Sequence, residues 1–226
     1  MKLRGVFQGI IFLYFIICIC SCAPTRFVKP LNKNEQAVNL SLGGPVIGFK
    51  DISIPVPFVT ATYGYGLDTS LTAFGSLNIT SALYGNAQLE LGVVKRVVQQ
   101  NNGFPGISIT PVANIIYRNK NAAKLYPEVD INAYWDYNKG RNFFYAGIST
   151  WFELAARKAY DVKQDNYALI SPMIGEYFVR KKWSVNVELK IVAANISSQK
   201  TVADYKTPLG NNGALGIYVG YTKKFR

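Results

Sequence analysis

The stretch that decides the fold is Ala214-Leu-Gly-Ile-Tyr-Val-Gly-Tyr-Thr-Lys-Lys-Phe225, near the C-terminal end of the sequence. Its residues alternate between two chemical kinds. Every second position from Leu215 to Tyr221 is apolar or aromatic, and the positions between them carry Ala, Gly, Tyr or Thr. A period of two is that of a β-strand, whose side chains point alternately to opposite faces. We therefore predict a strand whose two faces meet different surroundings.

Nine earlier segments have the same period, although Pro111 and Pro172 interrupt two of them. Each is near the length that crosses a bilayer when tilted, and short links tend to alternate with long ones, as in outer-membrane barrels. The predicted fold is all-β: a single antiparallel up-and-down closed transmembrane β-barrel of about ten strands, over residues 37–226. The nine segments are 37–44, 56–66, 70–80, 87–97, 107–118, 125–136, 143–154, 167–180 and 183–192.

Charge indicates which face of these strands meets lipid. The apolar face is almost free of charge in the strand centres, as a lipid-facing surface requires, because Lys or Arg at mid-bilayer costs about 2–4 kcal/mol. The polar face carries most of the strand carboxylates and is predicted to line the lumen. These acidic residues are Glu90, Glu128, Asp130, Asp136, Glu153, Glu176 and Glu188.

Large aromatic residues of the predicted apolar face gather at the strand ends on the side of the short turns. A soluble core would have no reason to place its aromatic residues at one height, whereas a membrane interface has one. We therefore predict an aromatic girdle at the lipid headgroups. Its members are Tyr65, Trp135, Phe144, Tyr177, Trp183, Tyr221 and Phe225.

The N-terminal residues read as a targeting segment. Lys2 and Arg4 precede an apolar run too short for a typical membrane span, and the run ends Ile19-Cys20-Ser21-Cys22. This ending resembles the bacterial lipobox, whose last cysteine is acylated and becomes the first residue. We predict a lipoprotein signal peptide over 1–21, lipidation of Cys22, and a polar lipid-anchored tether over 22–36. An ordinary signal peptide with stray cysteines is the alternative.

The lipobox-like ending, the Gly66-Leu-Asp-Thr69 turn and the aromatic closing strand together resemble small outer-membrane β-barrel proteins of Gram-negative bacteria. The resemblance covers 37–225 as a pattern and implies outer-membrane lipid as the surroundings. It is specific for architecture and implies no named activity. Lys223 and Arg226 depart from the usual closing strand. Acidic residues after the lipid cysteine resemble a surface-export signal, and their absence here favours an anchor in the periplasmic leaflet.

Several function classes are excluded by composition. The sequence has no His, so the histidine-dependent chemistry of barrel phospholipases, acyltransferases and proteases is absent. Without His and with few Cys, we expect no transition-metal site, and no phosphate-binding loop or dinucleotide motif indicates a cofactor. The net charge is +12, but the basic residues fall in short groups between apolar runs. That distribution favours anionic lipid headgroups over nucleic acid as the partner.

The remaining candidate site is a polar cluster in the lumen. Strand order places Arg118, Glu128, Asp130 and Glu153 near the long-loop mouth, with Glu176, Glu188 and Lys190 deeper. Crowded carboxylates can serve as general acid and base or can attract a cation. The interpretation we favour is an ion-paired plug, because a small barrel has room for little but side chains.

The sequence thus predicts a non-enzymatic, lipid-anchored outer-membrane β-barrel with a structural or interaction role at the cell envelope. Tyr and Lys residues in the long loops could bind a surface partner or glycan. Two alternatives stay open: a periplasm-facing lipocalin-like lipoprotein that binds an apolar ligand, and a narrow cation or small-solute pore.

Overall fold

The computed structural model describes residues 26–49, 52–118, 123–156, 163–199 and 203–225. The predicted signal peptide, 1–21, and the predicted lipidation residue, Cys22, lie outside the described residues. None of the helical segments in the described part of the chain is long and apolar enough to span a membrane.

Eleven strands and one short helix make up the described fold. They are β1 (Gln36–Phe49), β2 (Ile52–Pro55), β3 (Phe58–Asp68), β4 (Leu71–Asn78), α2 (Ile79–Leu83), β5 (Asn86–Val98), β6 (Gly106–Arg118), β7 (Lys124–Tyr137), β8 (Asn142–Phe152), β9 (Ala168–Val179), β10 (Trp183–Ser197) and β11 (Asn212–Phe225).

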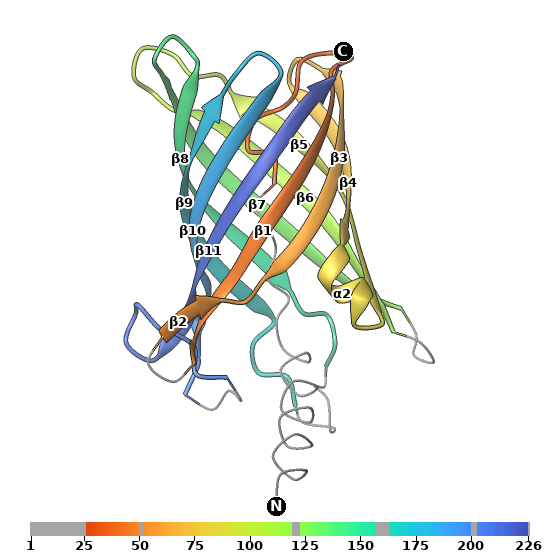
Figure 1. Cartoon of the computed structure of the whole chain (residues 1–226), viewed down its shortest axis with the longest axis vertical. Coiled ribbons are helices and arrows are strands. Elements are labelled where there is room, and N and C mark those ends of the chain that lie inside the picture. Colours follow the sequence, from red (N-terminus) through yellow and green to blue (C-terminus); the bar gives the residue numbers. More distant parts are fainter. Residues whose placement is uncertain (1–25, 50–51, 119–122, 157–162, 200–202, 226) are drawn as a thin grey trace, which may run out of the picture.

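Ten of these strands close into a barrel (Figure 1). Each pairs antiparallel with its neighbour in the chain, and β11 returns to pair with β1 from Gln36–Phe225 to Pro45–Gly216. Closure leaves the barrel without a free sheet edge. A lipid-exposed sheet must be closed in this way, because an open edge would leave backbone groups unpaired in the hydrocarbon. β2 stands apart and, among the residues that the structure describes, pairs with the end of β1 alone. The predicted fold class, a closed antiparallel up-and-down barrel of ten strands, is confirmed.

The two ends of the barrel differ (Figure 1). One end, the short-turn end, carries the start of β1, the end of β11 and the tight links after β3, β7 and β9. The opposite long-loop end carries α2 and the links 153–167 and 198–211. The start of the first strand and the end of the last strand therefore both lie on the side of the short turns, as in outer-membrane barrels.

The two prolines fit the sheet by omitting backbone pairs. Pro111 pairs with Val129 of β7, but pairing with β5 lapses between Gly92–Val112 and Lys95–Ile109. Pairing of β9 with β10 begins at Met173, the residue directly after Pro172 in the chain. Proline has no N–H to donate, so each strand continues while one ladder is interrupted.

Several strand bounds differ from the sequence prediction, and two of these differences have a clear local cause. The third predicted strand, 70–80, ends earlier at Asn78, because the Asn78 side chain accepts a hydrogen bond from the Ser81 N–H and caps α2. The first predicted strand, 37–44, continues to Phe49, because β2 gives its end a pairing partner.

Burial shows which face of the sheet is outward. Apolar residues of alternate positions are exposed on the exterior, for example Leu91 at 59%, Ile174 at 58% and Leu42 at 53%. Asn, Thr, Ser and acidic residues of the other positions are buried in the interior. This confirms the predicted orientation with the apolar face toward lipid. A lipocalin-like barrel needs an apolar interior, so that alternative is wrong.

Candidate functional site: the barrel lumen

Three lumen carboxylates converge because neighbouring strands place them at matching heights. Glu90 of β5 is the pairing partner of Asn114 in β6, and Asp130 of β7 is the partner of Ser149 in β8. Alternation turns Glu90, Glu128 and Asp130 inward, and each is at most 5% exposed. The barrel wall thus builds an acidic pocket from four consecutive strands.

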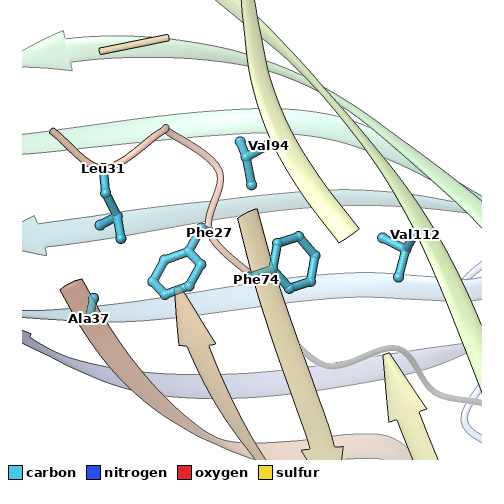
Figure 2. Close-up of a cluster of buried hydrophobic side chains, with 6 residues drawn as sticks. All are labelled: Phe27, Leu31, Ala37, Phe74, Val94 and Val112. Carbon is cyan, nitrogen blue, oxygen red and sulfur yellow. The ribbon is translucent and has the colours of Figure 1, made fainter. Parts of the chain in front are cut away.

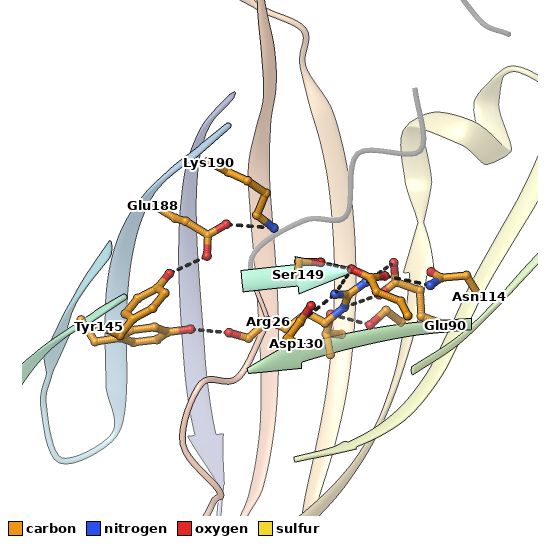
Figure 3. A network of polar contacts seen from close by, with 12 residues as sticks. Arg26, Glu90, Asn114, Asp130, Tyr145, Ser149, Glu188 and Lys190 are labelled. Carbon is orange, nitrogen blue, oxygen red and sulfur yellow. Dashed lines mark hydrogen bonds and ion pairs between the residues drawn. The ribbon is translucent and has the colours of Figure 1, made fainter. Parts of the chain in front are cut away.

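The Arg26 side chain fills this pocket (Figure 3). Its Nε and Nη2 donate to the two Glu90 oxygens at 3.0 and 3.2 Å, and its Nη1 and Nη2 donate to the two Glu128 oxygens at 3.0 and 2.7 Å. Nη1 also donates to Asp130 Oδ2 at 3.1 Å. A guanidinium has five N–H donors, and all five are used here. Bidentate pairing of this kind gives geometric specificity as well as energy.

Glu128 is oriented by the wall as well as by Arg26. Asn114 Nδ2 donates to Glu128 Oε2 at 2.9 Å, and Ser149 Oγ donates to Glu128 Oε1 at 2.6 Å. These donors come from the strands on either side of β7. The pocket is therefore held in shape by residues that belong to the sheet.

The segment that carries Arg26 lies inside the barrel. We call residues 26–31 the plug segment; Arg26, Phe27, Val28 and Leu31 are each at most 6% exposed. The sequence predicted a polar tether over 22–36, and for residues 26–31 that reading needs correction. Burial of the plug segment is favourable for two reasons. Phe27, Val28 and Leu31 supply apolar surface, and the lumen carboxylates supply negative charge opposite Arg26.

An apolar cluster packs the plug segment against the wall near the short-turn end. Glycine in β3 makes the room: a Cβ on Gly64 would lie 2.6 Å from the Phe27 ring, and one on Gly66 would lie 1.9 Å from the Asn32 carbonyl oxygen. The rings of Phe27 and Phe74 meet edge to face, 6.5 Å apart. Figure 2 shows the cluster, which consists of Phe27, Leu31, Ala37, Phe74, Val94 and Val112.

Single hydrogen bonds with separate wall residues fix the plug backbone. Tyr177 Oη donates to the Arg26 carbonyl at 2.7 Å, Ser108 Oγ donates to the Val28 carbonyl at 2.6 Å, and the Leu31 N–H donates to Thr72 Oγ1 at 2.7 Å. The plug segment thus lies outside the strand ladders, and the first strand begins at Gln36.

The second cation of the plug segment lies closer to the short-turn end. Lys29 Nζ donates to both Asp136 oxygens at 2.7 and 2.8 Å and lies 4.9 Å from the ring centroids of Tyr134 and Phe143. The side chains of this ion pair are more than a quarter exposed. The contact is therefore weaker than the fully buried Arg26 cluster.

A second polar network lies across the lumen. Lys190 Nζ is 3.2 Å from Glu188 Oε1, and Tyr145 Oη donates to Glu188 Oε2 at 2.5 Å (Figure 3). The sequence predicted that Glu188 and Lys190 would be neighbours. It predicted Glu176 as a third member, and that residue lies elsewhere.

Two residues of the predicted mouth cluster lie apart from Glu128 and Asp130. Arg118 is exposed at the end of β6. Glu153 follows β8 at the long-loop end, where its Oε1 accepts from the Ala155 N–H at 3.0 Å. The sequence placed both near the carboxylates, but the true register pairs Asn114, not Arg118, with Tyr126. Arg26, 102 residues away in the chain from Glu128, supplies the guanidinium instead.

The predicted faces of β9 are reversed at two positions. Tyr177 was assigned to the girdle and Glu176 to the lumen. In the structure Tyr177 is 5% exposed inside the barrel and stacks on Phe143 at 4.6 Å. Glu176 is partly exposed and pairs with Phe144 and Val187, and its carboxylate accepts from Tyr137 Oη. Pro172 and Gly175 interrupt the alternation of polar and apolar residues in this strand. The sequence therefore did not determine which set of alternate residues faces the lumen.

The other predicted girdle residues lie on the exterior near the short-turn end, where two stacked pairs form. Trp135 stacks on Phe144 at 4.9 Å, and Trp183 stacks on Tyr221 at 6.4 Å. Phe225 is 47% exposed, and Tyr65 is partly exposed.

Sequence reasoning missed Arg26 as a lumen residue. One signal was present: Phe27, Val28 and Leu31 are apolar residues in a stretch otherwise typical of a solvated linker. A second was the surplus of carboxylates over cations among the predicted lumen residues. A buried acidic cluster requires a cation, and Arg26 precedes the first strand by only ten residues.

The sequence matches no protein-family model and no curated protein. Solved structures share the fold. An outer-membrane channel from Pseudomonas putida F1 has a TM-score of 0.50 and 8% identity over 90% of this chain and 100% of that chain. The translocator domain of the autotransporter NalP from Neisseria meningitidis has a TM-score of 0.43 and 9% identity, over 98% and 96%. The first likeness shows that this chain has the fold of an outer-membrane β-barrel.

Proposed function

We propose that the protein is a non-enzymatic outer-membrane β-barrel whose lumen is closed by its own plug segment and by lumen side chains, with a structural or interaction role at the cell envelope. The single observation that carries the proposal is the Arg26 cluster. Five hydrogen bonds hold a buried guanidinium between β5 and β7, where the lumen of an open channel would be.

The chemistry of the lumen supports a closed barrel over a catalytic one. Glu90, Glu128 and Asp130 all hold Arg26, and Glu188 holds Lys190 and Tyr145. A general acid or base needs an accessible carboxylate within reach of a substrate, and these carboxylates are buried and engaged. A narrow cation or small-solute path remains the second candidate, favoured by the excess of carboxylates over cations around Arg26.

Single-channel recording in planar bilayers tests the closed lumen. We expect the wild-type protein to insert without steady conductance, because the plug segment and the buried lumen side chains occupy the interior of the barrel. Trypsin-resistant, heat-modifiable protein in the same sample would show that it is folded. Steady, cation-selective conductance by the wild-type protein would overturn the proposal in favour of the pore.

We also propose that Cys22 carries acyl chains. The support for acylation is the lipobox-like sequence Ile19-Cys20-Ser21-Cys22. Intact-mass analysis should find a mature chain that starts at Cys22 and bears acyl mass, and Cys22→Ala should lose that mass. A mature chain that starts elsewhere, or one without acyl mass, would rule the anchor out.

The leaflet is a separate question from the acylation. Arg26 follows Cys22 by four residues. It lies beside Glu90 and Glu128, and each of these is four residues from the long-loop end of its strand. The path of the plug segment therefore favours an anchor on the long-loop side, and not the periplasmic leaflet that the sequence predicted.

An epitope inserted after Ala23 should then be accessible to antibody on intact cells, because the long loops of outer-membrane barrels lie on the outer surface. Antibody binding only after the outer membrane is permeabilised would place this part of the chain in the periplasm.

A further inference from the structure

We propose that Glu90, Glu128 and Asp130 form a guanidinium-binding site in the lumen, which the chain's own Arg26 occupies as a tethered ligand. The inference goes beyond the closed lumen by assigning the ligand class of the pocket. It rests on the proposed function in one respect, that the plug segment is what fills this part of the barrel.

The acceptor geometry selects a planar guanidinium. The five donors of Arg26 meet two Glu90 oxygens, two Glu128 oxygens and one Asp130 oxygen at 2.7 to 3.2 Å. An ammonium group has three donors around one nitrogen and cannot bridge two carboxylates in this forked manner. The pocket therefore distinguishes a guanidinium from other monovalent cations by shape as well as by charge.

The pocket does not depend on Arg26 for its construction. Asn114 and Ser149 hold Glu128 from β6 and β8, and the sheet register fixes the heights of Glu90 and Asp130. Because these contacts belong to the wall, the site keeps its donors and acceptors when the arginine side chain is removed. A preformed site loses little affinity to reorganisation.

The site also has acceptor capacity beyond what Arg26 uses. Three carboxylates face one guanidinium, and Asp130 Oδ1 and Asn114 Oδ1 are buried without a hydrogen-bond partner among the described residues. Asp130 is 5% exposed and Asn114 is fully buried. Unpaired acceptors and uncompensated negative charge in a buried place favour a cation that donates several hydrogen bonds.

Arg26 reaches this site on a segment that forms no part of the strand ladders. Its backbone is fixed by single hydrogen bonds with Tyr177, Ser108 and Thr72. Its other contacts are the Lys29–Asp136 ion pair and the apolar cluster around Phe27 and Leu31. Such a segment acts as a ligand joined to its receptor, and tethering gives the arginine an effective concentration on the order of millimolar or higher. A free guanidinium compound should therefore bind only when Arg26 is absent.

Chemical rescue of the full-length Arg26→Ala variant tests the site. Ethylguanidinium is the fragment that this substitution removes, and ethylammonium at equal concentration is the matched control for charge and ionic strength. Urea unfolding in lipid vesicles, followed by tryptophan fluorescence, gives the readout. Ethylguanidinium should stabilise the variant saturably, raising its folded-to-unfolded ratio about eleven-fold at ten times the dissociation constant. Ethylammonium should not do so.

Two further samples make the result specific. Wild-type protein should not respond, because Arg26 already fills the pocket, and the Arg26→Ala/Glu128→Ala double variant should lose the rescue. If Arg26→Ala does not fold alone, the yield of heat-modifiable protein refolded with either compound becomes the readout. Equal effects of the two compounds, or rescue that survives Glu128→Ala, would overturn the site.

The outcomes also separate this inference from the closed lumen. Steady conductance by the wild-type protein would end the closed-lumen proposal while leaving a positive rescue in place. A failed rescue in a non-conducting protein would end the guanidinium site alone.

Discussion

At the scale of single residues, the lumen carboxylates are not equivalent. Glu128 accepts from Arg26 through both oxygens and also from Asn114 and Ser149. Asp130 accepts one bond from Arg26, and its second oxygen has no hydrogen-bond partner among the described residues. Glu128 therefore organises the cluster, whereas Asp130 adds negative charge with fewer compensating bonds.

This asymmetry predicts unequal effects of two isosteric substitutions. Glu128→Gln should lower the free energy of unfolding by about 3 kcal/mol, because it breaks a buried pair and turns an amide N–H₂ toward donors. Asp130→Asn should cost about 1 kcal/mol or less, because the lost bond is offset by relief of like-charge repulsion. Urea unfolding in vesicles measures both. Equal losses for the two variants would contradict this account of the cluster.

A glycine of β3 controls how the plug segment is seated. Gly66→Ala would place a Cβ 1.9 Å from the Asn32 carbonyl oxygen, so the chain at the end of the plug segment must shift. We expect trypsin to cut after Lys33 at least several-fold faster than in wild type, measured by mass spectrometry. Gly75→Ala is the control, since its Cβ would meet Leu91 at an ordinary 3.5 Å. Equal cutting rates in both variants would show that the seat tolerates a side chain.

At the scale of elements, the seam between β1 and β11 decides whether the sheet is a barrel. Asn39 and Thr222 are pairing partners across it, and Asn39 Nδ2 donates to Thr222 Oγ1 at 2.9 Å inside the lumen. The two strands are far apart in the sequence, so this pairing is a purely tertiary contact.

A cysteine pair tests the seam. Asn39→Cys/Thr222→Cys should form a disulfide on mild oxidation, because cross-strand partners lie within the Cα separation that a disulfide needs. The denatured, oxidised chain should migrate faster on a non-reducing gel and return to normal mobility with reductant. Asn39→Cys/Asn132→Cys, which joins β1 to β7, should remain uncrosslinked. A seam pair that behaves like this control would indicate an open sheet.

β9 shows the limit of reading faces from alternation. Its neighbours β8 and β10 alternate clearly, and their residues were assigned to the correct faces. β9 contains Pro172 and Gly175. Neither residue is clearly polar or apolar, so neither indicates which face of the strand it lies on. The pairing of Phe143 with Tyr177 settles the phase, because Phe143 is buried in the lumen.

At the scale of the whole molecule, the strands themselves hold the protein in the membrane. The exterior presents apolar side chains around a polar interior, and the closed ladder leaves its backbone groups paired. The proposed acylation of Cys22 adds to an attachment that the barrel already provides.

Removal of the lipid site should therefore leave the protein in the membrane. Cys22→Ala should stay in the pellet after alkaline carbonate extraction and should still shift its gel mobility on heating, like the wild-type protein. Membrane fractionation with blotting measures both properties. Release of Cys22→Ala into the soluble fraction would contradict a barrel that spans the bilayer by itself.

The sequence by itself determined the local properties: strand period, strand number, the chemical difference between the two faces, and the absence of histidine chemistry. These follow from neighbouring residues in one strand, where a two-residue period is visible without the fold. Only the tertiary structure decided that Arg26 enters the lumen, that Arg118 and Glu153 do not join Glu128, and that Tyr177 faces inward. Each depends on register between separate strands or on the path of a segment outside them. Alternation identified Ala214 to Phe225 as a strand. It carries no information about the register between strands or about the path of a segment outside them.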